Sequence, residues 1–340
     1  MAGICIAVDA MGGDNAPGEI IKGAVEALAD ERINIWLVGG EDAIKGELSA
    51  YKFDSARIKI INAASVIGND EQPTSAIRQK KDSSIVVGLN LLKDGQAQAF
   101  VSAGATGALL TGATLLVGRI KGVERPALGT LLPNEKGFSL LIDSGANVDA
   151  KPNYLLQFAK MGSLYMKNIM DIAKPRVGLL NIGAEREKGN MLTKEAYGLL
   201  ESSDINFIGN VEARDVPLGA ADVVVCDAFT GNVLLKYTEG FAKAVLGMIK
   251  KELTATTMTK IGALLAKGAF VNLKKSFDYR EVGGAPFLGL KALVVKAHGS
   301  SDAKAVGSAI RLCTNFAEKD IVGQISDSIQ NDIKERQHGI

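Results

Sequence analysis

The residues best suited to chemistry form a glycine-rich stretch, SAGATG, at positions 102–107. The stretch follows a short apolar run and precedes a helical pattern, so it predicts a tight turn at the start of a helix. Such a turn leaves backbone N–H groups exposed at the positive end of the helix dipole, where anions bind. Ser102 and Thr106 add hydroxyl groups, while Gly104 and Gly107 keep the turn almost free of side-chain bulk. An ordinary packing turn between a strand and a helix has the same composition and stays an alternative.

Lys188 and Asn232 are two further polar residues in turns that follow predicted strands. Lys188 precedes a glycine and an asparagine, a turn that would aim its amine across the mouth of a pocket. The alternative for Lys188 is a surface lysine paired with Glu185 or Glu187. Asn232 follows a Thr-Gly pair at the start of a predicted long helix, where it either contacts a ligand or caps the helix.

Three carboxylates, those of Asp9, Asp143 and Asp227, each end a predicted strand. Aspartates at such positions commonly cap helices or hold turns together, and we expect these three to brace their turns. Asn147 lies in the turn after Asp143. His298 is the only histidine inside the predicted folded body, and a site role and a structural role are both open for it.

Several motifs of known catalytic and binding sites are absent from the sequence. There is no G-x-S-x-G, no H-E-x-x-H and no Cys/His cluster with metal spacing. No glycine is followed by lysine, which excludes a Walker A loop, and no G-x-G-x-x-G follows a predicted strand. We therefore expect neither a metal ion nor a cofactor.

The composition is that of a globular protein, with 47% hydrophobic and 23% charged residues in 340 and a net charge of +1. A charge this small gives no case for nucleic-acid binding. The three cysteines are scattered, so we expect reduced core thiols in a cytosolic protein. No secretory signal and no apolar run of 18 residues is present, and a single domain over 1–340 is expected.

Short apolar runs alternate with segments of helical period along the chain. The predicted strands span 3–9, 33–39, 58–62, 97–102, 177–182, 205–209, 221–226 and 292–296. The predicted helices include 17–30, 74–93, 154–171 and 193–202. An antiparallel hairpin is predicted for the segments 127–133 and 139–143. We expect a three-layer α/β/α sandwich with a mostly parallel sheet. Ligands in such sheets collect at the carboxyl ends of the strands, where the polar turns would share one rim.

The polar turns also carry a resemblance to a known family. The sequences are DAMGGD at 9–14, SAGATG at 102–107, GANVD at 145–149, KGN at 188–190, GNVEARD at 209–215, FTGN at 229–232 and AHGSSD at 297–302. In this order they resemble the bacterial acyl-acyl-carrier-protein:phosphate acyltransferases, from about residue 6 to 311. Two positions depart from the family pattern: Ala105 stands where an asparagine amide is expected, and Asn15 where histidine is common.

The resemblance implies an enzyme that makes acyl phosphate reversibly from fatty acyl carrier protein and inorganic phosphate, the first step of phosphatidic acid synthesis. It also implies a fold similar to phosphotransacetylases and to isocitrate and isopropylmalate dehydrogenases, and a homodimer. Phosphate is already anionic at neutral pH and a thiolate leaves readily, so the protein must chiefly hold phosphate and stabilise the oxyanion. We expect the 102–107 turn to bind phosphate, and Lys188 with Asn232 to orient it and donate to the tetrahedral oxygen.

The segment 241–277 carries seven lysines and a single acidic residue, Glu252, which gives a local charge of +6. Its apolar residues recur at roughly helical spacing, so a protruding helical pair is predicted over 239–279. A basic amphipathic pair can lie on an anionic membrane, receive the acidic carrier protein, or pack as a dimer interface. We expect cytoplasmic localisation with peripheral membrane contact, close to the membrane glycerol-3-phosphate acyltransferase that would use the product.

Three other functions stay open at this point. A short-chain phosphotransacetylase would use the same chemistry with acyl-coenzyme A as donor. A nicotinamide-dependent decarboxylating dehydrogenase would share the expected fold, although the sequence lacks the arginine-rich substrate motif. A non-catalytic adaptor would bind the carrier protein and the membrane without turnover.

Overall fold

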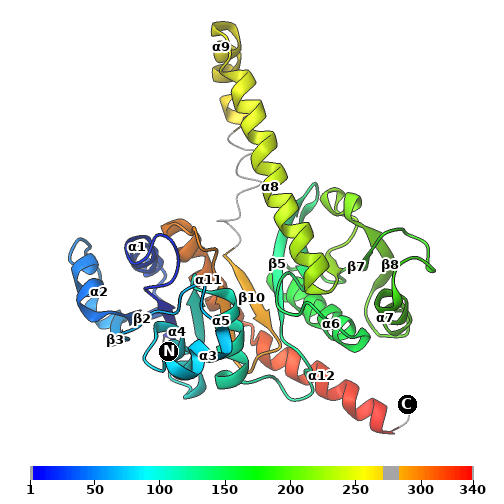
Figure 1. The fold of residues 1–340 in the computed structure, drawn as a ribbon, viewed down its shortest axis with the longest axis horizontal. Coiled ribbons are helices and arrows are strands. Elements are labelled where there is room, and N and C mark those ends of the chain that lie inside the picture. Colours follow the sequence, from blue (N-terminus) through cyan, green and yellow to red (C-terminus); the bar gives the residue numbers. More distant parts are fainter. Residues whose placement is uncertain (1–2, 271–282, 339–340) are drawn as a thin grey trace.

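The protein is organised around one eleven-stranded sheet, seen here in a computed structural model that describes residues 3–270 and 283–338. The strand order is β3-β2-β1-β4-β11-β10-β5-β6-β9-β7-β8. Helices cover both faces of the sheet, and one long helix extends away from the body (Figure 1). The predicted α/β sandwich with a mostly parallel sheet is confirmed.

One half of the sheet is built from five parallel strands. They are β1 (Ile4–Asp9), β2 (Ile33–Gly39), β3 (Ile58–Asn62), β4 (Ala99–Ser102) and β11 (Leu293–Lys296). The helices of this half are α1 (Gly18–Ala27), α2 (Glu41–Leu48), α3 (Pro73–Gln79), α4 (Ser84–Lys93), α5 (Thr106–Gly112) and α11 (Ala303–Glu318). A short π-helix, Ala113–Val117, continues α5. Every residue of β4 is buried, as expected for a strand covered on both faces.

The other half contains a hairpin and three parallel strands. The hairpin joins β5 (Ala127–Asn134) to β6 (Gly137–Ile142), and the following strands are β7 (Val177–Asn181), β8 (Phe207–Glu212) and β9 (Val223–Val225). Its helices are α6 (Pro152–Ile169) and α7 (Met191–Glu201), with a 3₁₀ turn at Ala213–Leu218. The predicted antiparallel hairpin is confirmed, with a loop of two residues, Glu135 and Lys136.

A strand that the sequence pattern did not predict, β10 (Ala285–Leu288), links the two halves. It pairs antiparallel with β11 on one side and with β5 on the other. Because β5 and β6 are also antiparallel, the strands β6, β9, β7 and β8 run opposite to β1, β4 and β11. The prediction that all polar turns share one rim is therefore wrong in its simple form.

Sheet twist partly offsets this reversal. Five steps separate β4 from β9 in the sheet, and neighbouring strands rotate by about 20–25° each, which gives about 100–125° in all. A twist of this size means that the two groups of strands are not simply antiparallel in space. The polar turns form two groups, one on each half of the sheet.

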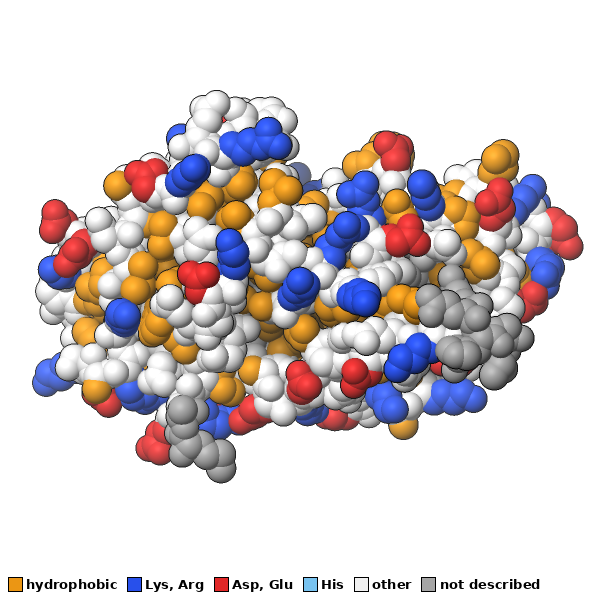
Figure 2. Space-filling model, turned by 90° about the horizontal axis from the view of Figure 1, so that it is seen from below, with side chains coloured by type: hydrophobic (Ala, Val, Ile, Leu, Met, Phe, Trp, Pro, Cys, Tyr) orange, Lys and Arg blue, Asp and Glu red, His pale blue; other side chains and the backbone are white. Residues whose placement is uncertain are grey.

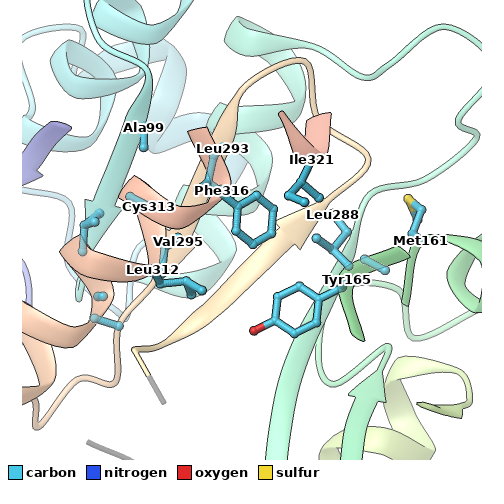
Figure 3. Close-up of a cluster of buried hydrophobic side chains, with 14 of the residues drawn as sticks. Ala99, Met161, Tyr165, Leu288, Leu293, Val295, Leu312, Cys313, Phe316 and Ile321 are labelled. Atoms are coloured by element: carbon cyan, nitrogen blue, oxygen red, sulfur yellow. The ribbon is translucent and has the colours of Figure 1, made fainter. Parts of the chain in front are cut away.

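The apolar core is continuous across the two halves. Figure 3 shows Tyr165 and Met161 of α6 beside Leu288 of β10, with Phe316 of α11 packed nearby. The rings of Tyr165 and Phe316 lie with centroids 5.7 Å apart. The last helix, α12 (Ile321–His338), adds Ile321, Ile325 and Ile329 to the same cluster.

Two predicted helical boundaries differ from the structure. The segment predicted as one helix over 74–93 forms α3 and α4, because Ser83 caps a new helix by accepting a hydrogen bond from the backbone N–H of Val86. The long helix α8 (Ala228–Leu253) begins at Ala228, capped by Asp227, so Asn232 is not its cap.

The helix α8 leaves the half that carries β7 and β8 and extends away from the body, with α9 (Thr257–Leu265) at its far end (Figure 1). This is the protrusion predicted over 239–279, of which residues 271–279 lie outside the described part of the chain. Across the described residues, none of the helices combines the length and hydropathy needed to cross a membrane.

The charges are mixed on the face turned away from the protrusion. Figure 2 shows Lys and Arg side chains interspersed with Asp and Glu on that face, around patches of hydrophobic side chains. A surface of this kind fits the net charge of +1.

Candidate active site

The first group of polar turns follows β1, β4 and β11. The Ser102 hydroxyl donates a hydrogen bond of 2.7 Å to Oδ2 of Asp9 and accepts one of 3.0 Å from the Gly104 N–H. Asp9 and Ser102 are both buried. Burial raises the pKa of the Asp9 carboxyl, against the hydrogen bonds from Ser102 and from the Met11 N–H. Ser102 therefore shapes the glycine-rich turn from inside, with its hydroxyl already engaged.

Three of the remaining residues of this turn are more accessible, while Ala103 and Ala105 are buried. Gly104 and Thr106 are half-buried, and Gly107 is exposed. Ala105 occupies the cap position of α5 and offers no side-chain oxygen, so the first N–H groups of this helix have no side-chain cap. The departure from the family pattern at Ala105 thus leaves the backbone as the hydrogen-bonding part of the turn.

Two neighbouring loops pack against the glycine-rich turn. The Asp14 N–H donates to the Gly299 carbonyl at 2.7 Å, and the Asn15 amide donates to the carbonyls of Ser300 and Ser301. Gly12 comes so close to the turn that an added Cβ would lie 2.6 Å from the Gly104 nitrogen. The three loops after β1, β4 and β11 therefore form one surface.

Lys296, which the sequence analysis did not assign to the site, lies in this surface. Its ammonium donates hydrogen bonds to the carbonyl oxygens of Ala103, at 3.1 Å, and Ala297. Burial lowers the pKa of Lys296 to about 8; nearby Asp9 and Asp14 act to raise that pKa, and Lys236 to lower it. The signal in the sequence was a lysine ending an otherwise apolar strand, LVVK.

His298 follows Lys296 and is exposed. Its Nδ1 accepts a hydrogen bond from the Ser300 N–H, which places the proton of the neutral ring on Nε2. Burial of part of the ring lowers the pKa of His298, so the neutral form prevails at neutral pH. Glu239 and Lys236 of α8 both influence that pKa, and they form an ion pair of 2.8 Å with each other. The helix α8 thus passes beside the loops of the first group.

The second group of polar turns follows β6 and β9. The Asp143 carboxylate accepts N–H bonds from Leu128, Gly145, Ala146 and Asn147, and one from the Asn147 side-chain amide. Burial raises the pKa of Asp143, and these hydrogen bonds act in the opposite direction. Asp227 accepts from the N–H and the hydroxyl of Thr230, which fixes the start of α8. Each carboxylate is therefore engaged by its own turn.

The start of α8 is held tightly against the Asp143 turn. The Ala228 N–H donates to the Asn147 carbonyl at 2.9 Å, and a Cβ added at Gly231 would lie 2.0 Å from the Asp143 carbonyl oxygen. Ala146 also packs on the apolar cluster that contains Ala105 and Ala108. The two backbone contacts hold the start of α8 and the Asp143 turn together.

Asn232, in the helix after β9, and Lys188, in the turn after the neighbouring strand β7, are both exposed. Gly189, with φ of 99°, supplies the left-handed turn that follows Lys188, and Asn190 caps α7. Among the residues that the structure describes, no ion pair joins the Lys188 amine to a carboxylate, so the pairing with Glu185 or Glu187 offered as an alternative is not seen there. In the same described residues, no hydrogen bond joins Lys188, Asn232 and the 102–107 turn to one another.

The cysteines supply no nucleophile. Cys5, Cys226 and Cys313 are buried free thiols, and burial raises the pKa of each, that of Cys5 to about 11. Among residues 3–270 and 283–338, no three His, Cys, Asp or Glu side chains are grouped as a metal site would require. The chemistry available in the described site is therefore hydrogen bonding and charge.

The solved structures that resemble this chain share its fold. A phosphotransacetylase from Streptococcus pyogenes aligns with a TM-score of 0.64 and 17% identity over 94% of both chains. A 4-hydroxythreonine-4-phosphate dehydrogenase from Klebsiella pneumoniae aligns with a TM-score of 0.52 and 14% identity over 93% of this chain and 99% of that one. The expected likeness to phosphotransacetylase and dehydrogenase folds is confirmed.

The sequence relatives are much closer. A phosphate acyltransferase of Clostridium perfringens strain SM101 is 54% identical over 326 residues, which cover 95% of this chain and 96% of the relative. A phosphate acyltransferase of Clostridium botulinum strain Alaska E43 is 52% identical over 96% of this chain and 98% of its own length. The family described as "Fatty acid synthesis protein" matches residues 4–324. This chain belongs to that family.

Proposed function

We propose that the protein transfers the acyl group of a fatty acyl carrier protein to inorganic phosphate. Membership of a family whose relatives are named phosphate acyltransferases supports this reaction. The observation that carries the proposal is the surface formed by the three loops after β1, β4 and β11, where the Lys296 ammonium contacts the Ala103 carbonyl of the glycine-rich turn and the first N–H groups of α5 have no side-chain cap. An anion and an activated carbonyl are what such a surface accommodates.

The chemistry needs little beyond positioning. A phosphate oxygen attacks the thioester carbonyl carbon, a C–O bond forms, and the carbonyl oxygen becomes an oxyanion. The tetrahedral intermediate collapses with cleavage of the C–S bond, and the thiolate takes a proton from solvent. A thiol with a pKa near 8.5 leaves without strong acid catalysis, so positioning and oxyanion stabilisation account for most of the required acceleration.

The roles of individual residues follow from their accessibility. Gly104 and Thr106, which are half-buried, and exposed Gly107 are proposed to line the phosphate site, although the Gly104 N–H is already engaged by Ser102. Buried Ser102 and Asp9 hold the turn in shape. Lys188 and Asn232 are exposed and are proposed to orient phosphate and donate to the oxyanion. Asp143, Asn147 and Asp227 brace the second group of turns, and His298 lies at the margin of the site.

The assembly and location of the enzyme are also proposed. A homodimer is proposed through the exposed apolar face of α8, where Val233, Tyr237 and Phe241 recur at every fourth residue and the last two rings stack at 5.8 Å. Peripheral contact with an anionic membrane is proposed through α9, which would deliver acyl phosphate to a membrane glycerol-3-phosphate acyltransferase.

The test mixes the purified protein with acyl carrier protein thioester and inorganic phosphate, without added metal. Release of free carrier thiol that depends on phosphate, together with acyl phosphate trapped by hydroxylamine, is the expected result. Thiol release at the same rate without phosphate would identify a thioesterase and contradict the proposal.

A second donor belongs in the same assay. The fold shared with phosphotransacetylases makes acyl-coenzyme A the alternative donor. Long-chain acyl carrier protein is expected to be used with a higher kcat/KM than acetyl-coenzyme A, and the reverse order would favour a short-chain phosphotransacetylase.

A further inference from the structure

Lys296 occupies a distinctive place in the sheet. It ends β11 in register with Ser102 of β4, and β4 lies beside β1 with Val101 opposite Val8. One residue further along, this register places Asp9 beside Ser102. Asp9, Ser102 and Lys296 therefore lie side by side at the ends of three parallel strands, where the glycine-rich turn begins. They carry a carboxylate, a hydroxyl and an ammonium group in that order.

The hydrogen bonds of Lys296 leave part of its capacity unused. An ammonium group has three N–H donors, and two of them go to the carbonyls of Ala103 and Ala297. Among the described residues, the third donor has no hydrogen-bond partner, and no carboxylate lies within ion-pair distance. Ala103 belongs to the glycine-rich turn itself, so the amine lies directly beside the backbone proposed to bind an anion.

The electrostatic surroundings of Lys296 favour an added anion. A partly buried ammonium is costly unless negative charge lies close to it. Asp9 from β1 and Asp14 from the loop after β1 supply some of that charge, while Lys236 from α8 opposes it. The balance leaves the pKa of Lys296 lowered to about 8, so the group is still mostly protonated at neutral pH. A bound phosphate would stabilise the protonated form.

We propose that the Lys296 ammonium binds the phosphate substrate and holds it against the glycine-rich turn at 102–107. The assignment rests on the proposed function and adds to it the cationic residue that balances the substrate's charge. Lys296 would then act on phosphate affinity and leave the affinity for the acyl donor unchanged.

Two substitutions of Lys296 test this, with a matched control. Lys296→Met removes the charge and Lys296→Arg keeps it, while Lys291→Met removes an exposed lysine from the loop just before the same strand. Lys296→Met is expected to raise the KM for phosphate by about 10- to 100-fold, the range of a lost charge-assisted hydrogen bond, with the KM for acyl carrier protein unchanged. Lys296→Arg is expected to recover most of the phosphate affinity, and Lys291→Met to behave as wild type.

The pH dependence distinguishes an electrostatic role of the Lys296 charge from a purely structural role of its hydrogen bonds. Deprotonation above pH 8 removes the charge of Lys296, so the wild-type KM for phosphate is expected to rise about tenfold per pH unit there. In Lys296→Arg this rise should be absent up to about pH 10, because a guanidinium stays protonated. Asp9, Asp14 and Lys236 face the amine in both proteins, so the difference between the two profiles belongs to residue 296.

A binding measurement without acyl donor keeps this inference distinct from the proposed function. Inorganic phosphate is expected to raise the Tm of the wild type and of Lys296→Arg, at constant ionic strength, and not that of Lys296→Met. A wild type that forms no acyl phosphate would contradict the proposed function, while this shift would still support phosphate binding by Lys296. An unchanged phosphate KM in Lys296→Met, or equal increases in both KM values with a lowered Tm in both variants, would overturn the inference.

Discussion

Lys188 and Asn232, which are proposed to orient phosphate and donate to the oxyanion, lie on different elements, and their side chains differ in charge. Lys188 lies in the turn between β7 and α7, held by the left-handed Gly189, whereas Asn232 lies in the second turn of α8. Both are exposed and neither is needed to close a buried hydrogen-bond network. Substituting them therefore probes chemistry with little risk to the fold.

Lys188→Ala is expected to reduce kcat by roughly 10²–10³-fold, the cost of losing one oxyanion donor in other enzymes. Steady-state acyl phosphate formation measures it, and circular dichroism checks the fold. Lys194→Ala, another exposed lysine on the adjacent helix α7, is the matched control and should retain wild-type turnover. Asn232→Ala should cost less, because an amide carries no charge. Normal turnover in Lys188→Ala would show that Lys188 is a surface lysine that takes no part in the reaction.

At the scale of elements, the start of α8 depends on one glycine. A Cβ at Gly231 would lie 2.0 Å from the Asp143 carbonyl oxygen, which is a backbone atom and cannot turn aside. Gly240, in the same helix, has nothing within 4 Å of its Cβ position. The same chemical change at these two positions should therefore have opposite effects.

Gly231→Ala is expected to destabilise the protein by about 3 kcal/mol, the upper range for overpacking, and to displace the Asp143 turn. Gly240→Ala should stabilise it by up to about 1 kcal/mol, because alanine has the higher helix propensity. Thermal unfolding of both variants measures the contrast. Equal Tm values for Gly231→Ala and wild type would mean that α8 does not approach the turn this closely.

Much of the fold could be predicted from local sequence, because its strands are continuous apolar runs. The run ICIAVD gives β1 and the run INIWLVG gives β2, within a residue or so of the predicted bounds. The helix break at Ser83 was missed although seven consecutive polar residues, 78–84, interrupt the apolar pattern and serine is a typical helix cap. Strand β10 was missed because its four residues, APFL, are too short to show a period.

The sequence predicts which turns carry polar residues, but it does not predict how those turns are arranged in space. Polar residues after strands marked the turns, and Asp227 does cap a helix, as expected of an aspartate in that position. Which turns meet depends on strand order and direction, and the pairings of β10 join residues far apart in sequence. Lys296 became visible as a site residue only when its strand was placed beside β4.

At the scale of the molecule, α8 joins the body to an exposed tip. Lys236 and Glu239 of its lower part lie near His298 and the first group of turns, and its far end carries α9. The tip exposes Met258, Ile261, Leu264 and Leu265, with Leu265 84% exposed, which is unusual for apolar side chains grouped on one short helix. Lys260 and Lys267 are exposed beside them. Apolar side chains flanked by lysines are typical of segments that insert into the interface of an anionic bilayer.

The protein is therefore expected to co-sediment with anionic vesicles, and to be released by salt because each near-surface lysine contributes about 1 kcal/mol of screened attraction. A Leu264→Glu, Leu265→Glu variant should lose most of this binding, since two acids would have to enter the apolar part of the interface.

The matched control is Ile208→Glu, Leu218→Glu, which adds the same two charges at exposed apolar positions in the β8 region. Both variants are compared with wild type on vesicles of zwitterionic lipid with and without anionic lipid, after size-exclusion chromatography has shown that their oligomeric state is unchanged. Equal sedimentation of the tip variant and the control would show that α9 does not bind the membrane, and that its exposed apolar side chains serve another partner.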